Sequence, residues 1–310
     1  MIVPLPGMVR LWALEAFAHG AEVVSFFRWR QAPFGQEQMH AGLLRPDDKP
    51  APGLQEAAKV AREIAEMPDV DAGQSDVALI FDYESAWAIQ VQPQGQGQDY
   101  FALVFDTYRT LRRLGLNVDV VGPDAALSDY KLIAAPGLFQ VPRAIDNFNG
   151  LAVLGPRTGL KTPDFAIPSD LAPRLSGLEC RIVEVESLRP DMPVPLTCGG
   201  QVEHWFETLE SPSEALKQAE DGRAAVVRSD NKIYIAGQLD PTTMFNLYRD
   251  WLSESGVTTT SMPVGVRQRT AGQRAYVFNH AAEVRSFRGR ELPPASVTEM
   301  ATPSPGKSNR

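Results

Sequence analysis

The sequence predicts an α/β protein whose middle part is an open, doubly wound sheet, followed by a small β unit. Two observations lead to this prediction. Short, nearly continuous apolar runs alternate with helical patterns over residues 76–154, as in a parallel sheet covered on both faces. Beyond Gly155 the pattern becomes β-rich, with turn residues between the runs. We therefore expect one part to carry the parallel strands and later residues to add antiparallel ones.

Composition excludes several classes of protein. The chain has 310 residues, 44% of them hydrophobic and 22% charged, which is ordinary for a soluble globular protein. Its formal net charge of −8 argues against a nucleic-acid partner. No window approaches the length of a membrane-spanning helix, and the first residues lack the pattern of a signal peptide. We therefore expect a cytoplasmic protein without a membrane partner.

The two cysteines, Cys180 and Cys198, are too few for a disulfide scaffold or a four-cysteine zinc site. A single disulfide between them is possible, but two inert thiols are favoured. We expect neither a metal nor any other cofactor.

The first seventy residues read as helix, strand, loop and helix. The first helix is expected over residues 8–19, ending at Gly20. Its predicted apolar stripe consists of Val9, Trp12, Ala13, Ala16 and Phe17. Residues 22–29 follow as a buried strand, and residues 34–40 as a polar loop. A second helix is expected over residues 54–67, ended by Pro68 and Asp69. The strand and loop resemble the last strand and substrate loop of a large barrel enzyme.

The middle part is predicted to be of the flavodoxin type. Its expected strands cover residues 76–82, 117–121, 131–135 and 151–154. Residues 92–98 are expected to be a loop, and residues 100–114 a helix ended by Gly115. The predicted apolar stripe of that helix consists of Phe101, Val104, Phe105, Tyr108, Leu111 and Leu114, with Arg109, Arg112 and Arg113 as a solvated face. Only residues 141–148 remain for a crossover helix before the fourth strand, which is short.

The last part adds strands over residues 180–185, 203–209, 224–229 and 232–236. Asp230 and Asn231 suit a two-residue hairpin turn between the last two. A helix over residues 242–253 opens after Asp240 and Pro241, a cap and first-turn pair, and ends at Gly256. Residues 264–269 and 274–279 form a small terminal β unit, and the Pro- and Ser-rich tail from Pro293 is expected to be disordered.

Glu37 and His40 give the sharpest local signal of a site. On a helix they would share a face and could ligate a metal, but dinuclear sites need a second such pair, which the chain lacks. A solvated loop without a role is the alternative that spacing alone favours. The functional interpretation is sugar binding, with Phe27 covering an apolar sugar face. Position favours it, because groups at the carboxyl ends of barrel strands and in the following loops bind substrate.

Other candidate groups have simpler explanations. Asp82 and Glu84 follow the first strand of the middle part, where a capped turn is favoured over a catalytic pair. Glu184 and Glu186 share one face of a predicted strand, and an exposed edge explains them. The middle part resembles class I glutamine amidotransferases in outline, but neither cysteine follows the strand-to-helix turn that their nucleophile needs. No phosphate-binding loop is present, because Gly95 and Gly97 lack the required third glycine.

Several motifs resemble the family 42 glycoside hydrolases, the bacterial β-galactosidases. They are PGMVRLWALEAFAHG at residues 6–20, FFRWRQ at 26–31, QEQMHAG at 36–42, FDYESAW at 81–87 and LGPRTG at 154–159. They occur in the order of the family and cover most of the chain. The resemblance implies a retaining hydrolase of terminal β-D-galactose residues, with a catalytic (β/α)₈ barrel, a flavodoxin-like trimerisation domain and a small C-terminal β domain.

Carried onto this sequence, the resemblance divides the chain into four parts. Residues 1–70 would be the C-terminal remnant of the barrel, roughly the last sixty of its residues. Residues 71–258 would be the trimerisation domain, 259–292 the β domain and 293–310 the tail. Phe27, Glu37 and His40 match the family's galactose contacts, and Trp29 is a weaker match. No catalytic residue is assigned, because both carboxylates of the family would fall before Met1.

Three hypotheses follow. In the first, the chain is a relative of the β-galactosidases and takes a galactoside substrate. In the second, it is a non-catalytic trimerisation module that forms a homotrimer. In the third, it is one part of a split enzyme. We expect no galactosidase activity from the chain by itself. We also expect removal of residues 1–70 to improve solubility, because a strand that is apolar on both faces needs neighbours.

Overall fold

The computed structural model describes residues 4–67, 75–93, 95, 97–211, 213, 215–271 and 274–301. The chain forms two compact units, one made of residues 1–74 together with 261–310 and the other of residues 75–260. The first and last parts of the sequence therefore fold together. The sequence by itself predicts them in separate parts. The predicted end of the helix at Pro68 and Asp69, and the tail beyond Ala301, lie outside the described residues.

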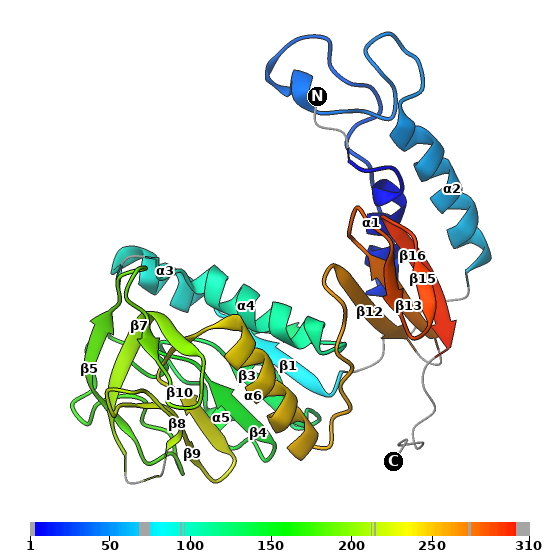
Figure 1. Ribbon diagram of the computed structural model, residues 1–310. Helices are drawn as coiled ribbons and strands as arrows, with labels where there is room; N and C mark the ends of the chain where they lie inside the picture. Colours follow the sequence, from blue (N-terminus) through cyan, green and yellow to red (C-terminus); the bar gives the residue numbers. More distant parts are fainter. Residues whose placement is uncertain are drawn as a thin grey trace. The chain divides into compact units, whose positions relative to one another are not determined.

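A mixed sheet forms the centre of the 75–260 unit. Its strands are β1 (Val77–Ile80), β2 (Asp119–Val121), β3 (Leu132–Ala135), β4 (Leu151–Leu154), β8 (Ala215–Gln218), β9 (Ala224–Ser229) and β10 (Lys232–Ile235). They follow the order β2-β1-β3-β4-β10-β9-β8 (Figure 1). The strands β2, β1, β3, β4 and β10 pair in parallel, and β9 and β8 extend the sheet as antiparallel strands. Every residue of β1, β3 and β4 is buried, which explains why these strands read as continuous apolar runs.

Four helices accompany this sheet within the described residues: α3 (Tyr83–Val91), α4 (Tyr100–Arg113), α5 (Arg143–Asp146) and α6 (Pro241–Glu254). α4 packs against both α3 and α6 (Figure 1). α5 is as short as the sequence predicted, and it buries Ile145. The sequence does not predict α3, because the apolar residues of this helix are spread around it and give no single stripe.

The predicted stripe of α4 is partly wrong. Val104 and Leu111 are buried, but so are Leu103 and Thr107, whereas the side chains of Phe101 and Phe105 are exposed. The predicted solvated arginine face is also wrong at one position. Arg112 is buried, and its Nη1 donates to the Leu116 carbonyl oxygen at 2.6 Å. The buried face of α4 is therefore rotated around the helix axis relative to the predicted stripe, and part of that stripe faces away from the core.

A second, antiparallel sheet lies in the same unit, with β5 (Arg181–Ser187), β7 (Gln201–Glu210) and β11 (Gly237–Leu239), and with β6 (Val194–Pro195) paired to β7. Two local predictions in this region are confirmed. Ser229 pairs with Lys232 around the two-residue turn, where Asp230 has a φ of 50°. Asp240 caps α6 by accepting hydrogen bonds from the amides of Thr242 and Thr243.

The other unit combines the first helices with the terminal strands. Its elements are α1 (Met8–Ala18), the 3₁₀ helix η1 (Gln36–Met39), α2 (Pro52–Glu66), β12 (Val266–Ala271), β13 (Arg274–Asn279), β16 (Ser296–Ala301) and the hairpin β14 (Arg285–Phe287) with β15 (Arg290–Leu292). α1 lies against the β12-β13-β16 sheet (Figure 1). Leu11 and Ala18 pack there on Tyr276 and Phe278. The buried face of α1 therefore centres on Leu11 rather than on Trp12, which is 52% exposed.

Two predictions for this unit are wrong. Residues 22–29 form no strand. The amides of Leu43 and Leu44 donate to the carbonyl oxygens of Arg28 and Trp29, and the adjoining Arg30 makes an isolated bridge to Leu44, but no ladder extends along the segment. A strand requires a neighbouring backbone along its length, and among the described residues this segment is paired at its end alone. The tail predicted to be disordered from Pro293 contains β16, whose six residues pair in register with β13.

Candidate functional site

The loops around Phe27 and His40 bring the predicted sugar-binding residues together. Arg28 links them: its Nη1 donates to Glu37 Oε2 at 2.8 Å, and its guanidinium carbon lies 5.5 Å from the centroid of the Phe27 ring. The Phe27 and His40 rings meet edge to face, with centroids 6.0 Å apart. Phe27 is 68% exposed, so the group forms an open surface rather than a closed cavity.

Backbone hydrogen bonds hold these loops in place without a regular strand. The amides of Leu43 and Leu44 donate to the carbonyl oxygens of Arg28 and Trp29 at 2.8 and 2.7 Å. Gly42 permits the close approach, since a Cβ there would lie 2.5 Å from the Gln31 nitrogen. Trp29 shares this backbone ladder, and its side chain is 65% exposed. The same residues that the sequence expected on a strand thus lie on a braced loop.

A shallow pocket of about 320 Å³ adjoins this surface and is lined by residues of the 28–37 segment. Glu37 is the single carboxylate in that lining, beside the cations Arg28 and Arg30. The arrangement offers a hydrogen-bond acceptor, two cationic donors and exposed rings, which suits a polyhydroxylated ligand. It does not offer a pair of carboxylates.

The other carboxylates singled out from the sequence have structural roles. Asp82 caps α3, accepting hydrogen bonds from the Glu84 and Ser85 amides at 3.1 and 2.9 Å, so the predicted capped turn is confirmed. Glu184 and Glu186 lie exposed on β5, an edge strand of its sheet, as predicted. Glu186 pairs with Arg223 at 3.0 Å.

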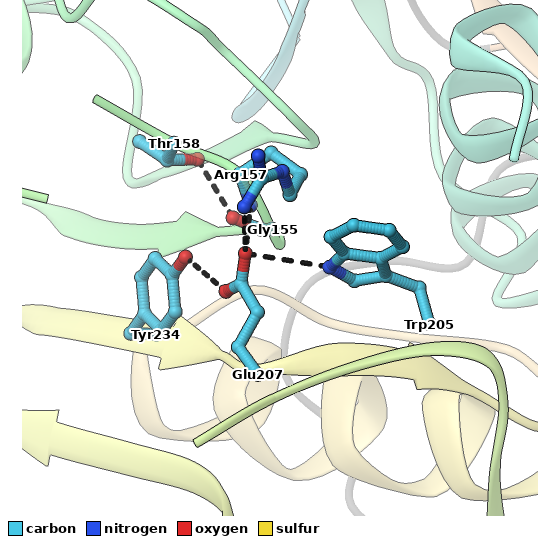
Figure 2. Close-up of polar contacts among 6 residues, drawn as sticks. All are labelled: Gly155, Arg157, Thr158, Trp205, Glu207 and Tyr234. Carbon is cyan, nitrogen blue, oxygen red and sulfur yellow. Dashed lines mark hydrogen bonds and ion pairs between the residues drawn. The ribbon is translucent and has the colours of Figure 1, made fainter. Parts of the chain in front are cut away.

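A buried polar network that was not predicted from the sequence lies inside the 75–260 unit (Figure 2). Glu207 is fully buried, and its Oε2 accepts a hydrogen bond from the Tyr234 hydroxyl at 2.6 Å. Its Oε1 accepts from the Arg157 amide at 3.0 Å and from Trp205 Nε1 at 3.4 Å, and lies 3.5 Å from Arg157 Nη1. The Arg157 guanidinium also stacks over the Trp205 ring.

Burial dominates the electrostatics of this network. It raises the pKa of Glu207, and the positive charge of Arg157 together with the surrounding hydrogen bonds opposes this rise. Burial likewise lowers the pKa of Arg157, while Glu207 acts in the opposite direction. Glu207 directly follows the buried Trp205 and Phe206 in β7. A carboxylate next to two aromatic residues in a strand-like run was the available signal.

Arg157 occupies a sharp turn after β4, in the sequence Gly155 to Gly159. Its φ of 70° lies in the left-handed region, which a residue other than glycine adopts only when its surroundings impose it. A tight turn after a buried strand is where some hydrolases carry their nucleophile. A guanidinium cannot act as one, since it stays protonated and has no lone pair to offer.

The two cysteines are unbonded, with Cys180 buried and Cys198 exposed, as the sequence favoured. Burial, and secondarily the negative charge of Glu207, raises the pKa of the Cys180 thiol to about 12. Such a thiol is protonated at neutral pH and is a poor nucleophile.

Within the described ranges, no three histidine, cysteine, aspartate or glutamate side chains gather in a way that could hold a metal ion. No helix in that part of the chain is both long and apolar enough to cross a membrane.

Comparisons with known proteins give a consistent result. A family model described as the β-galactosidase trimerisation domain matches residues 75–258, and one described as β-galactosidase matches residues 2–67. A β-galactosidase of Thermus thermophilus is 44% identical over 290 residues, covering 90% of this chain and 45% of that protein. A β-galactosidase of Halorubrum lacusprofundi is 32% identical and covers 95% of this chain and 47% of its own length.

Solved structures agree with these matches. The β-galactosidase from the psychrophilic Marinomonas ef1 superposes with a TM-score of 0.91 at 33% identity, covering 96% of this chain and 50% of that one. The enzyme from the Antarctic haloarchaeon Halorubrum lacusprofundi gives 0.90 at 29% identity, with the same coverage. The chain thus spans about half the length of the relatives that it matches.

Proposed function

Because this chain belongs to the family 42 β-galactosidases, we propose that it serves in the retaining hydrolysis of terminal β-D-galactose residues as part of a larger catalytic assembly. Its own contribution is to hold the sugar and to assemble subunits. The galactoside substrate and the homotrimeric state are both parts of this proposal. A cytoplasmic location is another part, supported by two thiols that remain unbonded.

The observation that carries the proposal is the grouping of Phe27, Glu37 and His40 on one open surface. In this assignment Glu37 accepts hydrogen bonds from sugar hydroxyls, and its ion pair with Arg28 fixes the carboxylate while leaving a second oxygen for the ligand. His40 donates or accepts a further hydrogen bond. The exposed ring of Phe27 covers an apolar face of galactose.

Hydrolysis of a galactoside requires catalytic groups that this surface does not contain. A retaining glycosidase uses two carboxylates about 5–5.5 Å apart, one as acid/base and one as nucleophile. The pocket beside Phe27 contains a single carboxylate, Glu37, among the residues that line it. We therefore infer that the catalytic pair is supplied by another segment or another chain, and that residues 4–67 are a part of a (β/α)₈ barrel that this other segment completes.

An assay on the purified chain tests the catalytic part of the proposal. We expect no turnover of a chromogenic β-galactoside, and turnover abolished by Glu37→Ala would contradict that expectation. Addition of the barrel half of a close relative should restore turnover if the chain is one part of a split enzyme.

Binding tests the sugar site separately. We expect the NMR signals of galactose to broaden when the full chain is added. The Glu37→Gln substitution should weaken this line broadening several-fold. Glu22→Gln is the matched control, since Glu22 is an exposed carboxylate of the same segment. Equal binding by both variants would remove Glu37 from the site.

A second role, subunit assembly, is supported by the family model that spans residues 75–258. We infer that this unit is of the flavodoxin type, because its parallel strands follow the order β2-β1-β3-β4-β10 that this class shows. Sedimentation of the full chain tests the assembly role, with a trimer expected and a monomer at all concentrations as the contradicting result.

A further inference from the structure

A small cavity lies at the carboxyl ends of three neighbouring strands of the mixed sheet. Pro136 follows β3, Gly155 and Pro156 follow β4, and Ile235 is the last residue of β10, and all four line the cavity. These strands are adjacent in the sheet and pair in parallel. Open α/β sheets bind ligands outside the carboxyl ends of such strands. The helices α4 and α6, which pack against each other (Figure 1), supply the other walls, so we call this space the α4–α6 cavity.

Two buried hydroxyl groups in the lining of this cavity have no partner. Thr110 of α4 and Tyr248 of α6 are 4% and 2% exposed. Among the described residues, neither hydroxyl makes a hydrogen bond, whereas the Thr107 hydroxyl donates to the Leu103 carbonyl oxygen at 3.0 Å. A buried hydroxyl without a partner costs free energy, so each such group calls for an explanation. A ligand in the cavity would provide the missing partner for both.

The Tyr248 hydroxyl is a hydrogen-bond donor at neutral pH. Burial raises the pKa of Tyr248 further above its ordinary value, and no neighbouring charge or hydrogen bond contributes to this rise. The group therefore keeps its proton. The Thr110 hydroxyl can also donate, which makes two donors that suit an oxygen-rich ligand.

A positive charge lines the same cavity. Arg113 lies one turn beyond Thr110 on α4, on the same face, and is half-buried. Its guanidinium carbon stacks 4.8 Å from the centroid of the Phe245 ring. In the described part of the chain the Arg113 guanidinium forms no ion pair, whereas Arg109, which also lines the cavity, pairs with Asp106 at 3.1 Å. Arg113 therefore offers a positive charge without a counter-charge.

The remaining lining limits the charge of the ligand. Glu203 and Asp106 line the cavity, and Glu203 Oε1 already accepts a hydrogen bond from Gln201 Nε2 at 2.7 Å. These two carboxylates would repel a doubly charged anion such as phosphate, since like charges in a partly buried site disfavour each other. A single negative charge matches Arg113.

The size and the apolar walls of the cavity limit the rest of the ligand. The volume is about 70 Å³, roughly twice the 30 Å³ that one water molecule occupies in the liquid. Only a group of a few heavy atoms fits. Several lining residues are apolar, among them Leu103, Leu239 and Met244. A carboxylate with a short alkyl chain combines these properties, because a guanidinium pairs well with a carboxylate and the chain can contact the apolar walls.

We propose that the α4–α6 cavity binds a short-chain organic monocarboxylate, with Arg113 as its counter-charge and the hydroxyls of Thr110 and Tyr248 as its hydrogen-bond donors. This second binding site goes beyond the proposed galactoside function. It lies in the 75–260 unit, whereas Glu37 belongs to the other unit. A bound carboxylate would join α4 to α6 and stabilise the folded unit, since it binds only the folded state.

Saturation-transfer NMR on the full chain tests this proposal, with propionate as the probe. Propionamide is the neutral counterpart of the same size, and inorganic phosphate is the doubly charged competitor. We expect saturation transfer to propionate and little to propionamide. We also expect that phosphate does not displace propionate.

Two variants locate the site. Arg113→Gln should weaken propionate binding by about tenfold, because it removes the charge-assisted hydrogen bonds. Tyr248→Phe should weaken it by about threefold and leave the thermal stability of the free chain unchanged or higher, because the hydroxyl that it removes has no partner there. This combination of effects separates a ligand contact from a structural role.

Matched controls lie on the same two helices. Arg249→Gln removes an exposed arginine of α6 that pairs with its neighbour Asp250, and Tyr108→Phe removes a hydroxyl of α4 outside the lining of the cavity. Both should bind propionate as the wild type does. Circular dichroism verifies folding, and Tyr248→Phe keeps the test open if the Arg113 variant misfolds.

Four results would overturn the proposal. The first is the absence of saturation transfer to propionate with the wild-type chain, and the second is equal binding by the wild type and the folded cavity variants. The third is equal binding of propionamide or phosphate, which would remove the carboxylate assignment. The fourth is displacement of propionate by galactose, which would place the probe at Glu37. None of the first three results bears on galactose binding at Glu37, which is measured separately.

Discussion

At the scale of single residues, Glu207 and Glu37 show how position decides the role of a carboxylate. Glu37 is exposed and paired with one arginine through Oε2, so its other oxygen is open to a ligand. Glu207 is fully buried, and its hydrogen bonds come from Arg157, Trp205 and Tyr234. A buried pair of this kind binds no ligand but penalises any change that leaves one charge alone.

We predict that Glu207→Gln destabilises the 75–260 unit by about 3–5 kcal/mol, because the Arg157 charge would remain buried without a counter-charge. The measurement is urea-induced unfolding followed by tryptophan fluorescence. Glu186→Gln is the control, since it breaks an exposed pair that should contribute about 0–1 kcal/mol. Coinciding unfolding curves for the two variants would show that the buried network is not stabilising.

At the scale of elements, helix ends were the most predictable features of the sequence. Asp240 accepts hydrogen bonds from the Thr242 and Thr243 amides at 3.0 and 3.1 Å, and also from the Gln201 amide at 2.9 Å. It therefore joins the start of α6 to β7. A cap of this kind depends on neighbours in the sequence, which is why Asp240 and Pro241 predicted it correctly.

We predict that Asp240→Ala destabilises the unit by about 1–2 kcal/mol through loss of the cap. Asp250→Ala is the control, because Asp250 lies on the same helix and pairs with its neighbour Arg249 on the surface. Thermal unfolding of both variants provides the comparison. A larger loss for the Asp250 variant would contradict the assigned role of the cap.

The cap should also be pH-dependent. Partial burial by itself would raise the pKa of Asp240, but hydrogen bonds from Thr243, Gln201 and Thr242 together lower it. Because the folded-state pKa is depressed, its stabilisation is present above the ordinary aspartate pKa of about 3.9 and is lost as the pH falls through the folded value. We expect the stability difference between the wild type and Asp240→Asn to shrink below about pH 4. A difference that stays constant down to acid unfolding would contradict this.

Strands were predictable only where they lie inside a sheet. The apolar runs of β1, β3 and β4 are buried on both faces, so composition alone identified them. Residues 22–29 are mostly apolar, but they belong to no sheet of the described structure and form a loop. The apolar pattern of a segment indicates that it could form a buried strand. It does not indicate whether neighbouring strands are present to pair with it.

At the scale of the whole molecule, the main correction concerns how the parts are joined. α1 packs on the sheet of β12, β13 and β16, where Leu11 and Ala18 contact Tyr276 and Phe278. Residues 1–74 and 261–310 form one unit as a result. The solubility gain expected from removing residues 1–70 loses its basis, because that removal would uncover the sheet.

We now predict the opposite outcome. Removal of residues 1–70 should lower the soluble yield and increase binding of the dye ANS, since the apolar face of β13 loses α1. The control is Trp12→Ala in the full chain, because Trp12 lies beside the buried Leu11 but is largely exposed. A truncated chain that is more soluble and binds no more dye than the control would restore the original expectation.

The sequence by itself determined the family, the parallel strands of the middle unit, and the ends of α1, α4 and α6. These features depend on local spacing or on motifs that are contiguous in the chain. Only the tertiary structure decided that Glu207 faces Arg157, that Phe101 and Phe105 lie on the surface, and that the two ends of the chain share a unit. Each of these depends on contacts between residues distant in sequence, and a pattern along one segment cannot specify the surface that it meets.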